Sequence, residues 1–143
     1  MDAEGIGFQL TGNRLHVLVV DDNRDAADSL CMLLRLWGYD CRVAYDGAAG
    51  LRAAYDYQPD CLLLDIAMPG MDGYTLARAV RAQPGLERAK LIALTAYSDE
   101  EYVRCSRQAG FDLHLVKPTA PFEIKRLMDM LSRLEPETQT PQE

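Results

Sequence analysis

The sequence predicts an α/β fold in which a parallel sheet of five strands is covered by helices on both faces. Two observations lead to this prediction. Short apolar runs recur along the chain, and each one stops at a charged or polar residue. The stretches between these runs carry apolar residues at helical spacing, so strands and helices alternate. Parallel strands joined in this way need crossovers that are long enough to hold a helix.

The first part of the chain contains two strand–helix units. Residues 15–20 form an apolar, β-branched run, which is typical of a strand buried on both faces. A helix follows, with Asn23 as its N-cap and Gly38 as its C-cap. Residues 39–44 predict the second strand, and residues 47–57 predict the second helix.

The middle of the chain continues the alternation. The third strand is the apolar run before Asp65, and it delivers this carboxylate to a loop rich in proline and glycine. Residues 74–82 predict the third helix, and residues 90–95 predict the fourth strand. Ser98 has the spacing of a capping box at the start of the fourth helix, which Gly110 ends.

The last unit and the two ends of the chain complete the expected organisation. Residues 111–116 predict the fifth strand, and the last helix begins at Pro121, a residue suited to a first helical turn. We expect residues 1–13 to be a flexible leader and residues 14–134 to form one domain. Residues 135–143 are polar and contain prolines, so we expect a disordered tail.

The most apolar strands, the first, third and fourth, belong in the middle of the sheet. This favours a flavodoxin-like doubly wound arrangement with strand order 2-1-3-4-5. In such open sheets, ligands bind at the carboxyl ends of the strands. At this edge the predicted strands end in residues that suit a phosphate and a cation: Asp21, Asp22, Asp65, Thr95 and Lys117.

The three carboxylates of this set predict a cation site. Carboxylates about 4 Å apart repel by roughly 4 kcal/mol per pair at an effective dielectric near 20. Oxygen ligands favour Mg²⁺, with Mn²⁺ as a possible substitute. We expect Asp22 and Asp65 to be direct ligands and Asp21 to act partly through water. Lys117 and the Thr95 hydroxyl then suit phosphoryl transfer to an aspartate nucleophile.

Composition limits the range of partners. The chain has 143 residues, 48% of them hydrophobic, and a formal net charge of −7, so we expect one domain without general attraction to nucleic acid or anionic membranes. No apolar run reaches the roughly 18 residues that span a bilayer, and no signal-peptide pattern is present, so we expect a cytoplasmic protein. The four cysteines lack metal-binding spacing, and we interpret them as reduced packing residues.

The chain resembles the receiver domain of two-component response regulators, including the chemotaxis regulators. The motifs that carry the resemblance stand in family order: Val-Val-Asp21-Asp22-Asn23, Leu-Leu-Leu-Asp65-Ile-Ala-Met-Pro69-Gly-Met-Asp72-Gly73, Leu-Thr95-Ala96 and Val-Lys117-Pro118. The resemblance covers about residues 14–134. It implies a chain that accepts phosphate from a histidine kinase or a histidine phosphotransfer protein and acts on a downstream protein target, without itself binding nucleic acid or membrane.

The same resemblance assigns roles to single residues. It implies that Asp65 is the phosphoacceptor, that Lys117 contacts the phosphoryl group and that Thr95 is the switch hydroxyl. It also implies four ligands for Mg²⁺: Asp21, Asp22, Asp65 and the backbone carbonyl of Ala67. In Asp72-Gly73, by contrast, we expect the aspartate to cap a turn or a helix.

Several positions depart from the usual pattern or concern partners. The switch ring on the fifth strand, usually Tyr or Phe, is His114. The two positions that tune phosphoryl lifetime are Ala67, which cannot position a water molecule, and Tyr97, which can shield the phosphate. We therefore expect slow self-dephosphorylation. Phe122 and Met130 lie off the inner stripe of the last helix, and we expect them to belong to a partner surface.

Two other functions compete with a signalling phosphoacceptor. A phosphorylation-independent interaction module with the receiver fold fits if His114 has lost the coupling to Thr95, although the intact acid cluster speaks against it. A hydrolase resembling the haloacid dehalogenase-like phosphatases needs a second aspartate two residues after the first, where Ala67 stands. We therefore expect a protein that assists only its own phosphorylation and dephosphorylation, not an enzyme.

Overall fold

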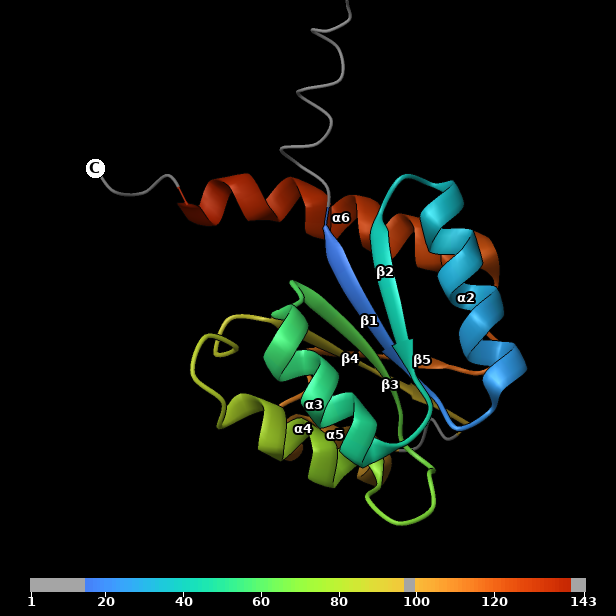
Figure 1. Cartoon of the computed structure of the whole chain (residues 1–143), viewed down its shortest axis with the longest axis vertical. Helices are drawn as coiled ribbons and strands as arrows, with labels where there is room; N and C mark the ends of the chain where they lie inside the picture. Colours follow the sequence, from blue (N-terminus) through green and yellow to red (C-terminus); the bar gives the residue numbers. More distant parts are fainter. Residues whose placement is uncertain (1–14, 97–99, 140–143) are drawn as a thin grey trace, which may run out of the picture. The chain divides into compact units, whose positions relative to one another are not determined.

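The structure is a computed structural model that describes residues 15–96 and 100–139, with the side chains of residues 100–103 and 134–139 outside the description. Its residues fall into two units. One unit, His16–Lys117, contains the whole sheet, and the other contains the last helix (Figure 1). The predicted capping residue Ser98 and the predicted leader, residues 1–13, lie outside the described residues.

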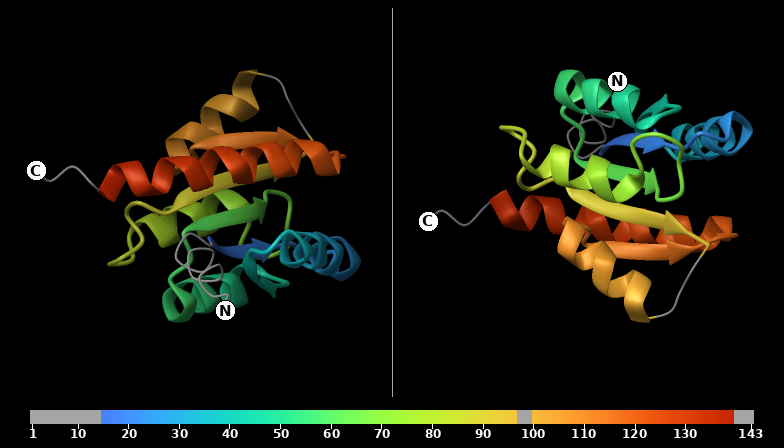
Figure 2. Two further views of the ribbon diagram at one scale, coloured as in Figure 1. Left: turned by 90° about the horizontal axis from the view of Figure 1, so that it is seen from above. Right: turned by 90° about the horizontal axis from the view of Figure 1, so that it is seen from below.

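The sheet has five parallel strands in the order β2-β1-β3-β4-β5. In chain order they are β1 (His16–Val20), β2 (Asp40–Ala44), β3 (Cys61–Asp65), β4 (Lys90–Thr95) and β5 (Leu113–Val116). Their arrowheads point in the same direction in Figure 2. The predicted fold class and strand order are confirmed.

Burial follows the position of each strand in the sheet. Every residue of β3 is buried. In β1 and β4 every residue except the first is buried. The edge strands β2 and β5 are only partly covered. The three most apolar runs therefore occupy the centre, as the hydrophobic effect requires.

Four helices lie in the same unit as the sheet. They are α2 (Arg24–Leu36), α3 (Gly47–Tyr57), α4 (Gly73–Arg81) and α5 (Glu100–Ala109). Figure 1 shows α3, α4 and α5 together on one face of the sheet and α2 on the other. The core beneath α3 to α5 includes fully buried side chains from strands and helices: Leu18, Leu62, Leu64, Leu76, Val80 and Leu91. Each such side chain contributes about 1.5–3 kcal/mol when it leaves water.

The ends of α2 show how local sequence determines helix boundaries. The side chain of Asn23 accepts a hydrogen bond from the Ala26 N–H at 3.1 Å, which confirms the predicted N-cap. At the other end Gly38 has a φ of +97°, and the Tyr39 N–H donates to the Leu34 carbonyl at 3.1 Å. This is the Schellman arrangement, for which glycine is the favoured residue.

The last helix, α6 (Pro121–Gln139), belongs to the second unit. On its inner side Ile124, Leu127 and Leu131 are buried, whereas Phe122 is 61% exposed and Met130 39% exposed, as predicted. The prediction of a disordered tail from residue 135 is wrong for residues 135–139, because the helical backbone continues through Pro136. A proline costs a helix one backbone hydrogen bond and marks a probable rather than an obligatory end.

Within the described residues, no helix combines the length and the apolar character that a bilayer crossing requires.

Candidate functional site

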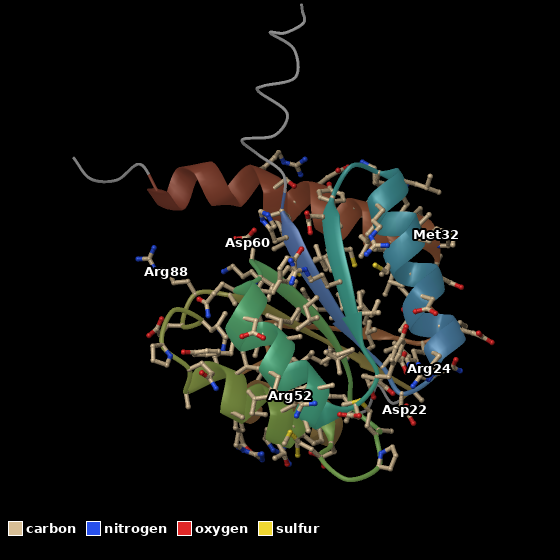
Figure 3. The ribbon with its side chains drawn as sticks, in the orientation of Figure 1. Asp22, Arg24, Met32, Arg52, Asp60 and Arg88 are labelled. Atoms are coloured by element: carbon tan, nitrogen blue, oxygen red, sulfur yellow. The ribbon has the colours of Figure 1, made fainter. Side chains whose placement is uncertain are left out.

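Three carboxylates from two neighbouring strands meet at the carboxyl edge of the sheet. Asp65 is the last residue of β3, and Asp21 and Asp22 directly follow β1. One oxygen from each of the three residues lies within 4.8 Å of the other two. Asp21 and Asp65 are buried, whereas Asp22 is exposed. Figure 3 shows Asp22 just beyond the arrowhead of β1. The structure therefore brings together the predicted acid cluster.

Backbone hydrogen bonds position Asp21 within this cluster. The Asp21 N–H donates to the carbonyl of Ala44, the last residue of β2, at 3.1 Å. The Asn23 N–H donates to Asp21 Oδ1 at 3.0 Å. Asn23 thus serves both as the helix cap and as a support for the carboxylate two residues earlier. The sequence indicated the first role but not the second, because the second depends on how the chain turns after β1.

Lys117 supplies the positive charge of the site. Its Nζ lies 3.1 Å from Asp65 Oδ1 and 3.4 Å from Asp21 Oδ2. The residue directly follows β5, and its N–H donates to the Thr95 carbonyl at 2.7 Å. This backbone bond joins the ends of β4 and β5, so the lysine is positioned by the sheet itself. The predicted meeting of Lys117 with the acid cluster is present in the structure.

The charges of the site change the protonation of its members. Burial is the main cause that raises the pKa of Asp65 to about 6; the hydrogen bond from Lys117 opposes this rise, and the charge of Asp21 adds to it. Burial alone would lower the pKa of Lys117, but its interactions with Asp65 and Asp21 outweigh this effect, and its pKa is raised. The lysine therefore stays protonated. Ionisation of Asp65 is less favourable than ionisation of an exposed aspartate.

Four other predicted site residues have different surroundings. Thr95 is buried at the end of β4, beside the acid cluster, and pairs in register with Val116. Ala67 is exposed in the loop after β3. His114 is half-buried on β5 and pairs in register with Ala93. Tyr97 lies outside the described residues.

The loop after β3 is packed tightly against the end of its own strand. Asp72 caps α4, because its Oδ1 accepts the Thr75 N–H at 2.9 Å, and the predicted capping role is confirmed. The next residue, Gly73, is buried, and a Cβ there would lie 2.6 Å from the Asp65 carbonyl oxygen. Only glycine allows α4 to begin this close to the strand that carries Asp65.

An arginine network that the sequence did not predict lies at the opposite end of the strands. Arg81, in the last turn of α4, donates to the Gly110 carbonyl at 3.0 and 2.8 Å and to the Ala89 carbonyl at 2.6 Å. It also donates to Asp112 Oδ2 at 2.8 Å, and this oxygen accepts the Leu91 N–H at 2.9 Å. The network joins the segments that lead into β4 and β5. No regular spacing in the sequence links these residues, so the sequence pattern could not predict the network.

The donor set of the acid cluster fits a hard divalent cation. Three carboxylates against one lysine leave two uncompensated negative charges when all three carboxylates are ionised. All available ligand atoms are oxygens, which Mg²⁺ prefers. Asp22 is exposed, so a cation bound there would keep water molecules in its coordination shell, as Mg²⁺ commonly does.

The fold and the site together define a class of protein. A family model described as response regulator receiver domain matches residues 17–131. The chain belongs to this family, and it is a receiver domain of two-component signalling. The family match and the complete acid–lysine cluster do not favour the phosphorylation-independent alternative.

Particular relatives agree with this assignment. The DNA-binding response regulator MtrA of Mycolicibacterium paratuberculosis is 37% identical over 111 residues, which are 78% of this chain and 48% of the relative. The chain thus spans about half the length of this relative. An uncharacterized 14.6 kDa protein of Leptolyngbya boryana is 38% identical over 115 residues, with 80% of this chain and 88% of the relative covered.

Solved structures show the same fold. Chemotaxis protein CheY4 of Vibrio cholerae matches with a TM-score of 0.79 and 27% identity, covering 82% of this chain and 98% of that one. The receiver domain of a sensor histidine kinase from Pseudomonas aeruginosa matches with a TM-score of 0.76 and 31% identity, covering 84% and 98%. That structure has a magnesium ion coordinated in its active site cleft.

Proposed function

We propose that Asp65 is the phosphoacceptor of this receiver domain and takes its phosphoryl group from a phosphohistidine. The observation that carries the proposal is the position of Asp65. It is a buried carboxylate at the end of the central strand β3, with a lysine ammonium at 3.1 Å and two further carboxylates in the same cluster. A buried, partly compensated carboxylate next to a fixed cation suits attack on an anionic phosphorus centre.

In the proposed reaction, a carboxylate oxygen of Asp65 attacks the phosphorus atom of the phosphohistidine. A P–O bond forms, the P–N bond breaks, and the imidazole leaves with the electron pair of that bond. Lys117 faces the developing negative charge on the phosphoryl oxygens, since its ammonium already lies beside Asp65. Thr95, buried at the neighbouring strand end, would hydrogen-bond the new phosphoryl group and report its presence.

The proposed magnesium ligands are the three carboxylates of the cluster, Asp21, Asp22 and Asp65, together with the backbone carbonyl of Ala67. Mg²⁺, or Mn²⁺ in its place, supplies positive charge that offsets the carboxylates and the incoming phosphoryl oxygens. The chain's own contribution is to hold the ligands in place. Asp21 is held by the Asn23 N–H, and Asp65 by its place in the sheet.

Switching and phosphoryl lifetime extend the same proposal. Thr95 moves toward the phosphoryl group, and the ring of His114, half-buried on the neighbouring strand, responds. Ala67 offers no polar side chain that would position a hydrolytic water molecule. If Tyr97 shields the phosphoryl group as well, the phosphorylated state is expected to last for minutes or longer.

The proposed partners follow from the class. The phosphodonor is a histidine kinase or a histidine phosphotransfer protein, and the output is contact with a downstream protein through a surface that includes Phe122 and Met130. We propose no direct nucleic-acid or membrane contact for residues 14–134. The protein acts as a signalling phosphoacceptor rather than as an enzyme with a separate substrate, and it works in the cytoplasm, where ATP charges the kinase.

The test uses acetyl phosphate as a small phosphodonor. The protein is incubated with acetyl phosphate and Mg²⁺, and its intact mass is measured. The wild-type protein should gain the mass of one phosphoryl group, and Asp65→Asn should gain none. Asp72→Asn is a matched control in the same loop, because asparagine caps a helix as well as aspartate does.

Two results would contradict the proposal. One is a wild-type protein that gains no phosphoryl group although it binds Mg²⁺. The other is an Asp65→Asn variant that is phosphorylated as fast as the wild type, which would place the acceptor elsewhere. Decay of the labelled protein within seconds would contradict the expected lifetime only.

A further inference from the structure

Two of the four cysteines, Cys31 and Cys41, lie against each other between α2 and β2. Cys31 is on α2 and Cys41 is on β2, and they are only 3% and 2% exposed. Cys31 lies near enough to the Cys41 thiol that, after burial, it contributes to the raised pKa of that thiol, which donates to the Arg42 carbonyl at 3.7 Å. Both cysteines are free, and neither belongs to the phosphoacceptor site. The contact is therefore a nucleophilic pair without an assigned role.

Arg35 gives independent geometric evidence for this pairing. It lies four residues after Cys31, so both side chains project from the same face of α2. Its Nε and Nη2 donate to the Cys41 carbonyl at 3.1 and 2.6 Å. The backbone of Cys41 is thus held directly beneath the helix face that carries Cys31. The same bonds place a permanent positive charge near the Cys41 thiol, and this charge opposes the larger rise in its pKa that burial causes.

We propose that Cys31 and Cys41 form a dithiol site that hydrogen peroxide converts to an intramolecular disulfide joining α2 to β2. The Cys31 thiolate attacks one peroxide oxygen, the O–O bond breaks, and hydroxide leaves. The Cys41 sulfur then attacks the sulfur of the Cys31 sulfenic acid. The S–S bond forms, the S–O bond breaks, and the oxygen leaves as water with the Cys41 proton. Two thiols are oxidised, and one peroxide is reduced to two water molecules.

The two cysteines have different parts in this sequence. Burial, followed by the neighbouring Cys31, raises the pKa of Cys41, so Cys41 stays protonated. In the proposed sequence Cys31 is the first nucleophile, and Cys41 resolves its sulfenic acid. Both thiols are buried, so the oxidant must be small and uncharged, and it enters through local opening between α2 and the edge strand β2.

The chain contains internal controls for this reactivity. Cys61 is equally buried, and burial followed by the charges of Asp60 and Asp112 raises its pKa, with no cysteine among the causes. It should stay a thiol under conditions that oxidise the pair. Met32, which follows Cys31, is 62% exposed and points away from the sheet in Figure 3. Its conversion to the sulfoxide shows that peroxide has reached the protein.

The experiment is a peptide map of the full chain after peroxide treatment. The reduced protein is freed of reductant, treated with hydrogen peroxide, alkylated, denatured and digested with trypsin. Cleavage after Arg24, Arg35 and Arg42 places Cys31 in residues 25–35 and Cys41 in residues 36–42. The expected product is these two peptides joined, two hydrogen atoms lighter than their sum and separated by dithiothreitol. Titration of the denatured protein should fall from four thiols to two.

Variants and a melting curve make the result specific. Cys31→Ala and Cys41→Ala should each abolish the joined peptide, whereas Cys61→Ala should retain it. The oxidised protein should melt at a higher temperature than the reduced one, and dithiothreitol should reverse the shift. The map of the wild-type protein stands by itself if an alanine variant fails to fold.

Three outcomes would overturn the inference. In the first, Cys31 becomes a sulfinic acid while Cys41 is recovered alkylated. In the second, the joined peptide contains Cys61 or Cys105. In the third, all four thiols survive a peroxide concentration that converts Met32 to the sulfoxide.

Discussion

Lys117 donates a hydrogen bond to Asp65 across 3.1 Å, and the same ammonium group lies 3.4 Å from Asp21. One cation therefore serves two buried carboxylates, while Asp22 adds a third negative charge to the cluster. The cluster therefore keeps an excess of negative charge. This excess is what would attract the proposed divalent cation. The repulsion lowers the stability of the fold at this point, and the proposed cation would offset it when bound.

The first prediction concerns how the effect of Asp65 on the free energy of unfolding depends on pH. The folded-state pKa of Asp65 is about 6, above its ordinary value of 3.8, so the native state binds more protons than the unfolded state between these values. The contribution of Asp65 to stability therefore falls as the pH rises through this window. Asp65→Asn should stabilise the metal-free protein at pH 7 by up to about 3 kcal/mol, and by little below pH about 4.

Urea unfolding in the presence of a chelator, at a series of pH values, measures this difference. Asp72→Asn serves as the control, because it removes a carboxylate from the nearby loop and leaves the cap in place. The difference in unfolding free energy between Asp72→Asn and the wild type should stay nearly constant across the same pH window. If Asp65→Asn raises the unfolding free energy by the same amount at every pH, the raised pKa of Asp65 is not the cause of the stabilisation.

The second prediction concerns Mg²⁺. A ligand that binds only the folded state stabilises it by RT ln(1 + [L]/Kd), which is about 2.7 kcal/mol at one hundred times Kd. Mg²⁺ should therefore raise the melting temperature of the wild-type protein. Asp22→Asn should abolish most of the increase, and without Mg²⁺ it should melt above the wild type, because repulsion with Asp21 and Asp65 is relieved.

Differential scanning calorimetry with and without Mg²⁺ checks both parts. Asp56→Asn, an exposed change on α3 outside the acid cluster, is the matched control and should keep the full increase. Equal increases in the Asp22→Asn and wild-type proteins would exclude Asp22 as a ligand.

The sequence predicted the acid cluster because its members occupy equivalent places on separate strands. Asp21, Asp22, Asp65, Thr95 and Lys117 all stand where an apolar run ends, and a parallel sheet brings such ends together. Helix caps were equally accessible, since Asn23 and Asp72 act within three residues of their own position. Features that depend on local sequence or on strand topology are those that a pattern can predict.

Other features depend on side chains that reach across the fold. Arg81 joins residues that follow it by 6 to 31 positions, and no periodicity encodes those contacts. The end of α6 was misplaced for another reason: Pro136 weakens a helix without obliging it to stop. The coupling of His114 to Thr95 stays a prediction, because it concerns a change between two states and the structure shows one.

The third prediction concerns the arginine network. Arg81→Lys should cost about 2–3 kcal/mol of stability, because lysine lacks the planar fork that serves the Gly110 and Ala89 carbonyls and Asp112 together. Arg78→Lys, an exposed change on the same helix, should cost less than about 0.5 kcal/mol. Urea unfolding measures both. Phosphorylation by acetyl phosphate should be unchanged in folded Arg81→Lys protein, since the network lies at the opposite end of the strands; a slower rate would contradict this separation.

The fourth prediction concerns Gly73, which lies against the backbone of Asp65, the proposed phosphoacceptor. In Gly73→Ala, the new methyl group would lie 2.6 Å from the Asp65 carbonyl oxygen and 2.7 Å from Ile66 Cα. Both are backbone atoms, so α4 or the end of β3 must shift, at a cost of about 1–3 kcal/mol. A shift of the Asp65 backbone also misplaces its carboxylate, so phosphorylation by acetyl phosphate should slow by roughly tenfold or more.

Gly70→Ala separates the effect on the site from the effect on stability. Gly70 has a φ of +78°, and a Cβ there would meet nothing within 4 Å. Alanine should therefore cost about 1–2 kcal/mol through backbone strain alone, without moving Asp65. Initial phosphorylation rates of the folded proteins, measured at a temperature where both variants are native by circular dichroism, distinguish the two. If both variants are slowed equally, the close approach of Gly73 does not position Asp65 for phosphorylation. If only Gly73→Ala is slowed, the close approach does position it.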